Sequence, residues 1–500
     1  MNLSKYILLL LVITCSALNA IAQKKPKPLN IIFILSDDHR YDAMGFMKKI
    51  EGLNTPGMDR MAREGAHIKN AFVSTALCSP SRASILTGQY AHTHTVVDNE
   101  APLPPSLKFF PMYMQQKGYQ TAFFGKWHMG NTDDQPQPGF NHWVSFRGQG
   151  IYYGSELNIN GKREKQPADA YITDQLTEHA INWMEQKKDK PFFVYLSHKG
   201  VHAEFYPAKR HEGLYANIPI NCPPSMYLTA TDSSKTFGNV TAPKTKVNYR
   251  DIPKWVREQR YSWHGVDHMY HGQIPFDQFY RRYLETLQGV DESIQKVLEW
   301  VTQQGLQDNT MVVYMGDNGF SFGEHGLIDK RHAYEESMRV PMLVWAPGMV
   351  KPQSVVEQII MNVDIAPTFL DLAGIATPSQ MQGYSFANIL KGNTAEWKRS
   401  KVFYEYYWEA AFPQTPTMFA IRSDRYKYIY YNGTWDINEL YDLQEDPYEM
   451  NNLIRDTSYR KTGLALRAEL FDWLQQTGGL QIPLKKAAGI RFDNLYRGTY

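Results

Sequence analysis

The sequence predicts an α/β protein with a large doubly wound, mostly parallel sheet flanked by helices, followed by a smaller C-terminal α+β domain bearing an antiparallel sheet. Two patterns lead to this prediction. Before about residue 380, short apolar runs alternate with longer helical patterns, as strands and helices do in doubly wound folds. After that point the runs alternate between apolar and polar residues, which is typical of antiparallel strands.

The predicted strands of the large sheet are apolar and rich in β-branched and aromatic residues, as expected for strands buried on both faces. They span residues 30–35, 120–124, 191–196, 310–315 and 341–345. Helical patterns between them span residues 111–117, 173–186 and 279–303. A further strand is expected at 72–76 and a helix start at 81–86, which would place residue 78 in a strand-to-helix turn.

The C-terminal part has its own pattern of short strands. We expect strands at residues 403–407, 419–423 and 426–431, a turn at Asn432-Gly433 and a final helix at 462–476. The chain is therefore divided into a large domain at 23–380 and a smaller one at 381–500. The irregular, polar residues 230–275 are expected to form an insertion over the active face.

The N-terminus reads as an export signal at residues 1–22. Lys5 supplies a positive charge, residues 6–12 are apolar, and Ala20-Ile21-Ala22 offers a cleavage site before Gln23. The apolar run is too short to span a bilayer, so no transmembrane segment is expected. The mature protein would be periplasmic or secreted. Lipid attachment at Cys15 is an alternative, although Thr14 is a poor residue to precede a lipidated cysteine.

Composition narrows the possible partners. The 500 residues are 43% hydrophobic and carry a formal net charge of only +2, so the chain can bury a large core and bulk charge does not indicate nucleic-acid binding. Once the signal is removed, Cys78 and Cys222 are the remaining cysteines. A disulfide between them is one interpretation. The other is that Cys78 belongs to a reaction centre and Cys222 is a structural thiol.

Polar clusters follow the predicted strands at their carboxyl ends. Asp37-Asp38 follows the first strand, Lys126 and His128 the second, His198 and His202 the third, and Asp317-Asn318 the fourth. Ligands in open α/β sheets bind outside the carboxyl ends of the strands, so these clusters should converge on one crevice.

The clusters divide into oxygen donors and cations. Three carboxylates and an amide oxygen suit calcium or magnesium, although an Asp pair by itself could be a solvated helix cap. Arg82, Lys126 and Lys330 are candidate fixed cations, and His128 and His202 are candidates to move protons. Each of these residues alone could also be a surface charge or a hydrogen-bonded histidine of the core.

Residues 78–88 read C-x-P-S-R followed by T-G, and with the clusters above they resemble the formylglycine-dependent sulfatases of the alkaline-phosphatase superfamily. The resemblance runs from about residue 30 to residue 453. It departs from the usual signature at Ile85, where leucine is common. The resemblance implies that a formylglycine-generating or sulfatase-maturing enzyme oxidises Cys78 to formylglycine (3-oxoalanine). It also implies that Ca²⁺, rather than Mg²⁺, is bound by residue 78 together with Asp37, Asp38, Asp317 and Asn318.

The resemblance also implies a mechanism and a substrate class. A hydroxyl of the hydrated aldehyde would attack sulfur, Arg82, Lys126 and Lys330 would hold the sulfate, and His202 would protonate the leaving alcohol. His128 would then deprotonate the second hydroxyl. Residues 195–215 are similar to segments of glycan-desulfating members, so a sulfated carbohydrate is the expected substrate. Candidate residues for contacting the sugar are His198, His264, His268, Arg331 and His332.

Two other functions remain compatible with the sequence. One is a phosphomonoester or phosphonate hydrolase on the same fold, which the oxidisable Cys78 motif disfavours. The other is a non-catalytic protein that binds sulfated glycans and whose Cys78 is never converted. The sugar and the sulfate position are left open by the sequence.

Overall fold

The computed structural model describes residues 28–130, 133–230, 249–262, 264–269, 274–433 and 436–483. The predicted signal peptide at residues 1–22, with Cys15, lies outside these residues, as does much of the predicted insertion. Within the described residues, no helix combines the length and the apolar character needed to cross a bilayer.

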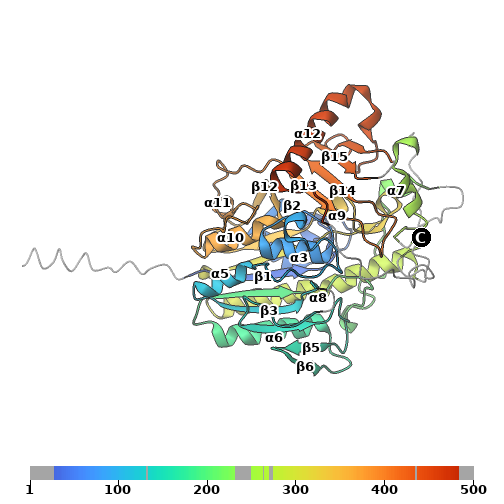
Figure 1. The fold of residues 1–500 in the computed structure, drawn as a ribbon. Coiled ribbons are helices and arrows are strands. Elements are labelled where there is room, and N and C mark those ends of the chain that lie inside the picture. The colour runs from blue at the N-terminus through green and yellow to red at the C-terminus, as the bar shows by residue number, and fades with distance from the viewer. Residues whose placement is uncertain are drawn as a thin grey trace, which may run out of the picture.

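A ten-stranded mixed sheet forms the centre of the protein (Figure 1). Five neighbouring strands in the middle of the sheet, β8, β1, β7, β3 and β4, run parallel to one another. β11 is antiparallel to both of its neighbours, and β5 and β6 form an antiparallel edge. In spatial order the strands are β12 (Ser354–Met361), β2 (Ala66–Phe72), β11 (Met342–Trp345), β8 (Thr310–Gly316), β1 (Asn30–Ser36), β7 (Phe192–Ser197), β3 (Gln120–Lys126), β4 (His142–Phe146), β5 (Glu156–Ile159) and β6 (Lys162–Lys165).

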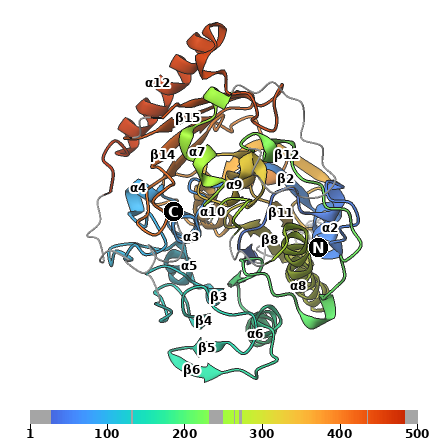
Figure 2. The same ribbon diagram turned by 90° about the vertical axis from the view of Figure 1, so that its right-hand side faces the viewer.

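Alternation along β1 explains why both faces of the sheet are covered. Phe33 and Leu35 belong to one hydrophobic cluster, whereas Ile32 and Ile34 belong to the other, and all four are fully buried. Figure 2 shows the sheet between two helical layers. One layer contains α3 (Cys78–Thr87), α5 (Phe110–Gln116) and α10 (Ile365–Leu372), and the other contains α2 (Pro56–Glu64), α6 (Ile172–Lys187) and α8 (Phe276–Gln303). The predicted doubly wound class is confirmed.

The region before Cys78 differs from the prediction. β2 ends at Phe72, so the strand expected at 72–76 is wrong, and α3 already begins at Cys78. The backbone beyond Phe72 is satisfied by other partners, because the Val73 N–H donates to the carbonyl of Met338 and the Ser74 N–H to Asn362 Oδ1. Residue 78 therefore lies in the first turn of a helix instead of in a turn before one.

The C-terminal part forms the expected antiparallel sheet. Its strands are β13 (Val402–Tyr406), β14 (Met418–Arg422), β15 (Tyr426–Tyr431) and β16 (Glu439–Asp442), and α12 (Arg460–Thr477) packs on it. The ring of Trp473 stacks on that of Phe403 with centroids 4.6 Å apart. The small sheet also contacts the helical layer of the large domain, since Glu405 on β13 accepts a 2.8 Å hydrogen bond from His92 on α4 (Ala91–His94). The boundary at residue 380 stays a prediction.

Candidate active site

The site is built where the ends of β1 and β8 meet. The two strands are parallel neighbours, and Ser36 pairs with Gly316. Asp37-Asp38, which follows Ser36, therefore lies beside Asp317-Asn318, which follows Gly316. The Asp38 backbone N–H donates to Asp317 Oδ1 at 3.1 Å, and Asn318 Nδ2 donates to Asp38 Oδ1 at 2.7 Å. Carboxylate oxygens of Asp37, Asp38 and Asp317 lie within 4.8 Å of one another.

These residues fit a hard divalent cation. Their donor atoms are carboxylate and amide oxygens, which calcium and magnesium prefer. Within the part of the chain that the structure describes, the buried Oδ1 of Asn318 has no hydrogen-bond partner. An amide oxygen that is buried without a partner costs free energy, and coordination to a cation would satisfy it. The predicted set of oxygen ligands is thus brought together by the fold.

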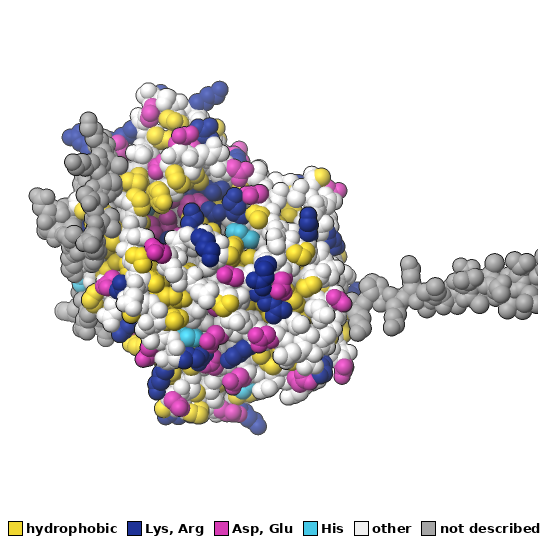
Figure 3. Space-filling view, turned by 180° about the vertical axis from the view of Figure 1, so that it is seen from behind, with side chains coloured by type: hydrophobic (Ala, Val, Ile, Leu, Met, Phe, Trp, Pro, Cys, Tyr) yellow, Lys and Arg dark blue, Asp and Glu magenta, His cyan; other side chains and the backbone are white. Residues whose placement is uncertain are grey.

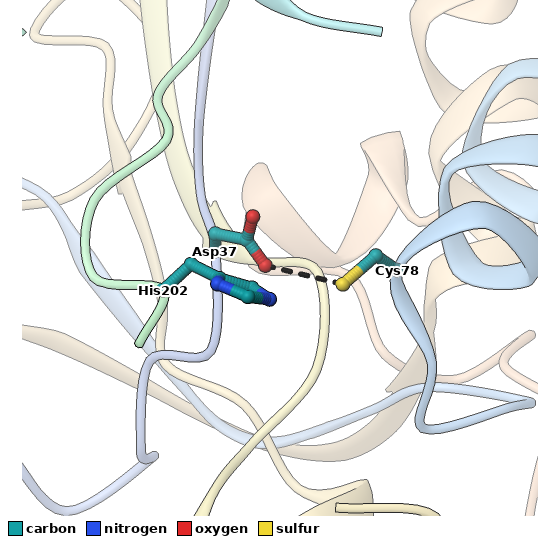
Figure 4. Close-up of side chains that lie close together, drawn as sticks. All are labelled: Asp37, Cys78 and His202. Atoms are coloured by element: carbon teal, nitrogen blue, oxygen red, sulfur yellow. Dashed lines mark hydrogen bonds between the residues drawn. The ribbon is translucent and has the colours of Figure 1, made fainter. Parts of the chain in front are cut away.

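Cys78 lies beside this cluster, at the first residue of α3. Its Sγ is 3.3 Å from Asp37 Oδ1, and the His202 ring approaches the same place from the segment after β7 (Figure 4). His202 Nε2 is 3.9 Å from Asp38 Oδ2. Cys78, His202 and His128 are all buried, with 7% of His202 and 5% of His128 exposed.

Buried cations compensate the carboxylates. Arg82 is one helical turn after Cys78 and donates to Asp317 Oδ2 at 2.9 Å through Nε. The ammonium of Lys126 contacts Asp37, and that of Lys330 donates to Asp38 Oδ2 at 2.6 Å. Each of the three acidic side chains of the cluster therefore has a basic partner. These ion pairs keep the buried like charges from repelling one another.

A close approach of two strands holds Lys126 in place. Gly125 on β3 has φ +115°, and a Cβ there would lie 1.8 Å from the carbonyl oxygen of Ser197 on β7. Only glycine can occupy that position. The Ser197 hydroxyl then donates to the Lys126 carbonyl at 2.8 Å, and Arg82 Nη1 donates to the same carbonyl at 2.6 Å.

The site has unusual electrostatics. Burial raises the pKa of Asp37, but attraction to the charges of Lys126, Arg82 and Lys330 outweighs burial and holds this pKa well below its usual range. Burial raises the pKa of Asp38 to about 7 despite its contact with Lys330. Burial and the charge of Asp37 also raise the pKa of the Cys78 thiol, so the thiolate is disfavoured at neutral pH. The unmodified sulfur is therefore a poor nucleophile.

The predicted proton carriers are both neutral in this environment. Burial, followed by repulsion from Lys126, lowers the pKa of His128 and of His202 well below the usual value. The backbone of His128 is left-handed, with φ +52°, and its carbonyl accepts a hydrogen bond from the Ser79 hydroxyl. Ser79 thereby fixes His128 at the start of α3. Because each ring is neutral, the nitrogen that carries no hydrogen can accept a proton, both in His128 and in His202.

The predicted sugar-binding residues separate into groups. His264 Nε2 lies 3.1 Å and Arg331 Nη1 2.5 Å from Asp329 Oδ2, so both surround the residue that precedes Lys330. His332 hydrogen-bonds to Ser321 at 3.1 Å within the protein. His268 is exposed.

His198 is a correction to the prediction. It is fully buried, and its Nε2 lies 2.9 Å from the Ser293 hydroxyl on α8, which places it in the helical layer instead of among the sugar contacts.

Some residues of the site were not predicted from the sequence. Gln149 Oε1 accepts a 2.5 Å hydrogen bond from Lys126, and Asp329 links Arg331 to His264. Gln149 follows β4, which the sequence analysis did not assign. A strand predicted at His142–Phe146 would have pointed to Gln149, because it lies just beyond the carboxyl end of that strand. Asp329 directly precedes the predicted cation Lys330, and its charge next to that cation is the feature of the sequence that could have indicated it.

Comparison with known proteins decides the family. The family model described as Sulfatase matches residues 29–375, well over half of the chain. The chain belongs to the sulfatase family. A second family model, N-sulphoglucosamine sulphohydrolase C-terminal, matches residues 323–476. The resemblance stated from the sequence motifs is thereby confirmed, and the protein is an enzyme of the sulfuric ester hydrolase class.

Similar proteins act on sulfated amino sugars. The chain is 34% identical to an N-acetylglucosamine-6-O-sulfatase of Bacteroides thetaiotaomicron, over 91% of this chain and 87% of that protein. It is 31% identical to the N-acetylglucosamine-6-sulfatase of Homo sapiens, over 83% and 73%. A solved structure in complex with its substrate D-glucosamine-2-N,6-O-disulfate superimposes with a TM-score of 0.81 and 32% identity, covering 92% of this chain and all of that one.

The raised pKa of Asp38 predicts a pH dependence for cation binding. Below pH 7 a cation must displace the proton of Asp38, so affinity should fall as the pH falls. We expect the Kd of Ca²⁺, measured by calorimetry, to be roughly tenfold weaker at pH 6 than at pH 8. Asp38→Asn should weaken binding at both values, whereas Asp174→Asn, which alters an ion pair with Arg210, should leave it unchanged. Equal affinity of the unaltered protein at both pH values would contradict this reasoning.

Proposed function

We propose that this sulfatase removes the 6-O-sulfate from a glucosamine-type residue of a sulfated glycan. One observation carries the proposal: the 34% identity to an N-acetylglucosamine-6-O-sulfatase extends over 91% of the chain. The match therefore includes the elements that surround the site as well as the metal and cysteine motifs.

We further propose that residue 78 acts as formylglycine beside a Ca²⁺ ion held by Asp37, Asp38, Asp317 and Asn318. A maturing enzyme would supply the oxidation of Cys78. Once hydrated next to the cation, the aldehyde supplies an oxygen nucleophile for sulfur and a second hydroxyl whose ionisation lets sulfate depart. The high pKa of the Cys78 thiol supports conversion, because it argues against direct use of the sulfur.

The side chains around residue 78 have separate roles in this proposal. Arg82, Lys126 and Lys330 are buried and positively charged, so they stabilise the charge that develops on the sulfate oxygens. His202 lies beside Cys78 and Asp38. Its imidazole is neutral in the free protein, so in this proposal the negative charge of the bound sulfate ester raises its pKa, and the protonated ring then delivers a proton to the oxygen of the departing sugar. His128 is the group proposed to accept the proton of the second hydroxyl.

The competing phosphatase function is less well supported. A two-metal phosphatase needs a second set of ligands. In the described ranges, the acidic, histidine and cysteine groups close enough to share an ion are Asp37–Asp38–Asp317 and Asp37–Cys78–His202, and these overlap at Asp37. Both groups therefore describe one place in the fold. The alternative disulfide between Cys78 and Cys222 is not formed, since both are free thiols.

Cys78→Ser tests the role of residue 78. A serine hydroxyl could accept a sulfate group, but it has no second hydroxyl with which to expel it. We expect the steady-state rate of sulfate release to fall at least about 1,000-fold, with no more than one desulfated sugar released per enzyme molecule and its sulfate retained on the serine. Cys222→Ser, which alters the other free thiol, should retain full activity. Sustained turnover by Cys78→Ser, or activity in protein whose residue 78 has the mass of an unmodified cysteine, would disprove the mechanism.

The substrate proposal is tested with positional isomers. N-acetylglucosamine 6-sulfate should be hydrolysed with a kcat/KM at least about 100-fold above that for the 3-sulfate and 4-sulfate isomers, because the leaving oxygen must reach His202. Sulfate release is measured by ion chromatography. A matched pair of aryl sulfate and aryl phosphate provides the control for reaction class. Faster hydrolysis of the 3-sulfate or 4-sulfate isomer would contradict the proposed 6-O-sulfate specificity. Faster hydrolysis of the aryl phosphate than of the aryl sulfate would contradict the proposed reaction class.

We also propose that the protein is exported and processed after Ala22. The order of Lys5, the apolar residues 6–12 and Ala20-Ile21-Ala22 supports this. The intact mass of protein recovered from the periplasm or medium should correspond to a chain that begins at Gln23. A lipid-modified mass, with a chain that begins at Cys15, would instead support membrane anchoring.

A further inference from the structure

Lys199 is a buried cation for which the sulfate-ester mechanism above has no use. It follows the end of β7 and precedes His202 by three residues, and only 4% of it is exposed. Its ammonium lies over the ring of Tyr152, with the nitrogen 4.7 Å from the ring centroid. Among the residues that the structure describes, no carboxylate, carbonyl or hydroxyl pairs with this ammonium.

The other cations of the site behave differently. Arg82, Lys126 and Lys330 each contact a carboxylate of the acidic cluster. Lys199 has no carboxylate partner among the described residues, and the face of one aromatic ring gives its ammonium only part of the stabilisation that an ion pair would give. Its charge is therefore available to pair with an anion. Such a group is stabilised when an anion arrives.

Lys199 belongs to the same electrostatic environment as residue 78. The charges of Lys126, Asp37 and Asp38 all act on it, and so does Cys78. Burial and repulsion from Lys126 lower the pKa of Lys199 to about 8, so it still carries its charge at neutral pH.

Tyr152 connects Lys199 to the surface. The Tyr152 hydroxyl donates to the carbonyl of His202 at 2.7 Å, which fixes the ring beside the segment that carries His202. On its other side the ring lies 6.2 Å from that of Tyr206, which is 48% exposed. An anion bound by Lys199 would thus lie near the reacting group and also near an exposed aromatic ring of the kind that packs on sugars.

Charge balance indicates what kind of anion is bound. The three carboxylates of the cluster are matched by Arg82, Lys126 and Lys330. A divalent cation adds two positive charges, and the sulfate ester that is cleaved brings one negative charge. Lys199 increases the remaining positive excess, which a second anionic group on the sugar would reduce.

We propose that Lys199 binds a second anionic substituent of the substrate, a sulfamate, sulfate or carboxylate, and so makes the enzyme prefer sugars that carry more than one negative charge. This inference rests on the proposed sulfatase function. It assigns Lys199 to substrate recognition, with Arg82, Lys126 and Lys330 left to hold the sulfate that is cleaved.

The test compares Lys199→Met with the unaltered enzyme on N-acetylglucosamine 6-sulfate, whose amide carries no charge, and on glucosamine N,6-O-disulfate. Methionine keeps most of the length of the side chain and removes its charge. We expect KM for the disulfate to rise about tenfold, with little change for the monosulfate, as for the loss of one charge-assisted hydrogen bond. Lys199→Arg should recover most of the affinity. Lys162→Met, at an exposed position on β6, is the matched control.

Thermal unfolding separates recognition from a structural role. Because Lys199 has no acceptor in the free protein, Lys199→Met should not lower Tm. An unchanged KM for the disulfate would overturn the proposal. An equal loss on both sugars would overturn it too, because it would assign Lys199 to the cleaved sulfate or, with a lowered Tm, to folding.

Binding to Cys78→Ser makes the inference independent of turnover. Calorimetry with glucosamine N,6-O-disulfate should show about tenfold weaker binding when Lys199→Met is added to Cys78→Ser. If the unaltered enzyme released no sulfate from either sugar but binding still depended on Lys199, the proposed function would fail and the role of Lys199 would stand. Binding that is indifferent to Lys199 would overturn that role.

Discussion

The site depends on keeping three carboxylates together inside the protein. The parallel pairing of β1 with β8 forces Asp37 and Asp38 to emerge beside Asp317, and burial makes their mutual repulsion expensive. Three buried cations reduce that repulsion. Arg82 from α3, Lys126 from β3 and Lys330 from the segment after β8 each bring a positive charge to a carboxylate. The fold thus collects charge of both signs from elements that are far apart in the sequence.

The balance of charge at the site is local, because the rest of the molecule is close to neutral. The formal net charge is +2, and Figure 3 shows acidic and basic side chains interspersed over one face of the protein. An anionic glycan would therefore gain little from the overall field. The proposed site instead offers it local charge, from the buried cations Arg82, Lys126, Lys330 and Lys199.

Much of this arrangement could be predicted from the sequence because the residues of the candidate site occur as contiguous motifs at strand ends. Asp37-Asp38, Lys126 with His128, and Asp317-Asn318 each follow a strand that is apolar enough to recognise. β6, with the sequence KREK, contains no apolar run that would identify it as a strand. β2 is only partly buried, so polar residues interrupt its apolar ones and it could not be recognised in the same way. The role of His198 could not be predicted either. Its direction depends on Ser293, a partner on a helix ninety-five residues away.

The complete burial of α3 sets an order of events in the life of the chain. All ten residues from Cys78 to Thr87 are inaccessible once the helix is packed. If Cys78 is oxidised as proposed, the modifying enzyme must reach a residue that the packed helix encloses. The proposal therefore places the modification before α3 packs against the sheet, so that the oxidation of Cys78 and the folding of the chain would compete in time.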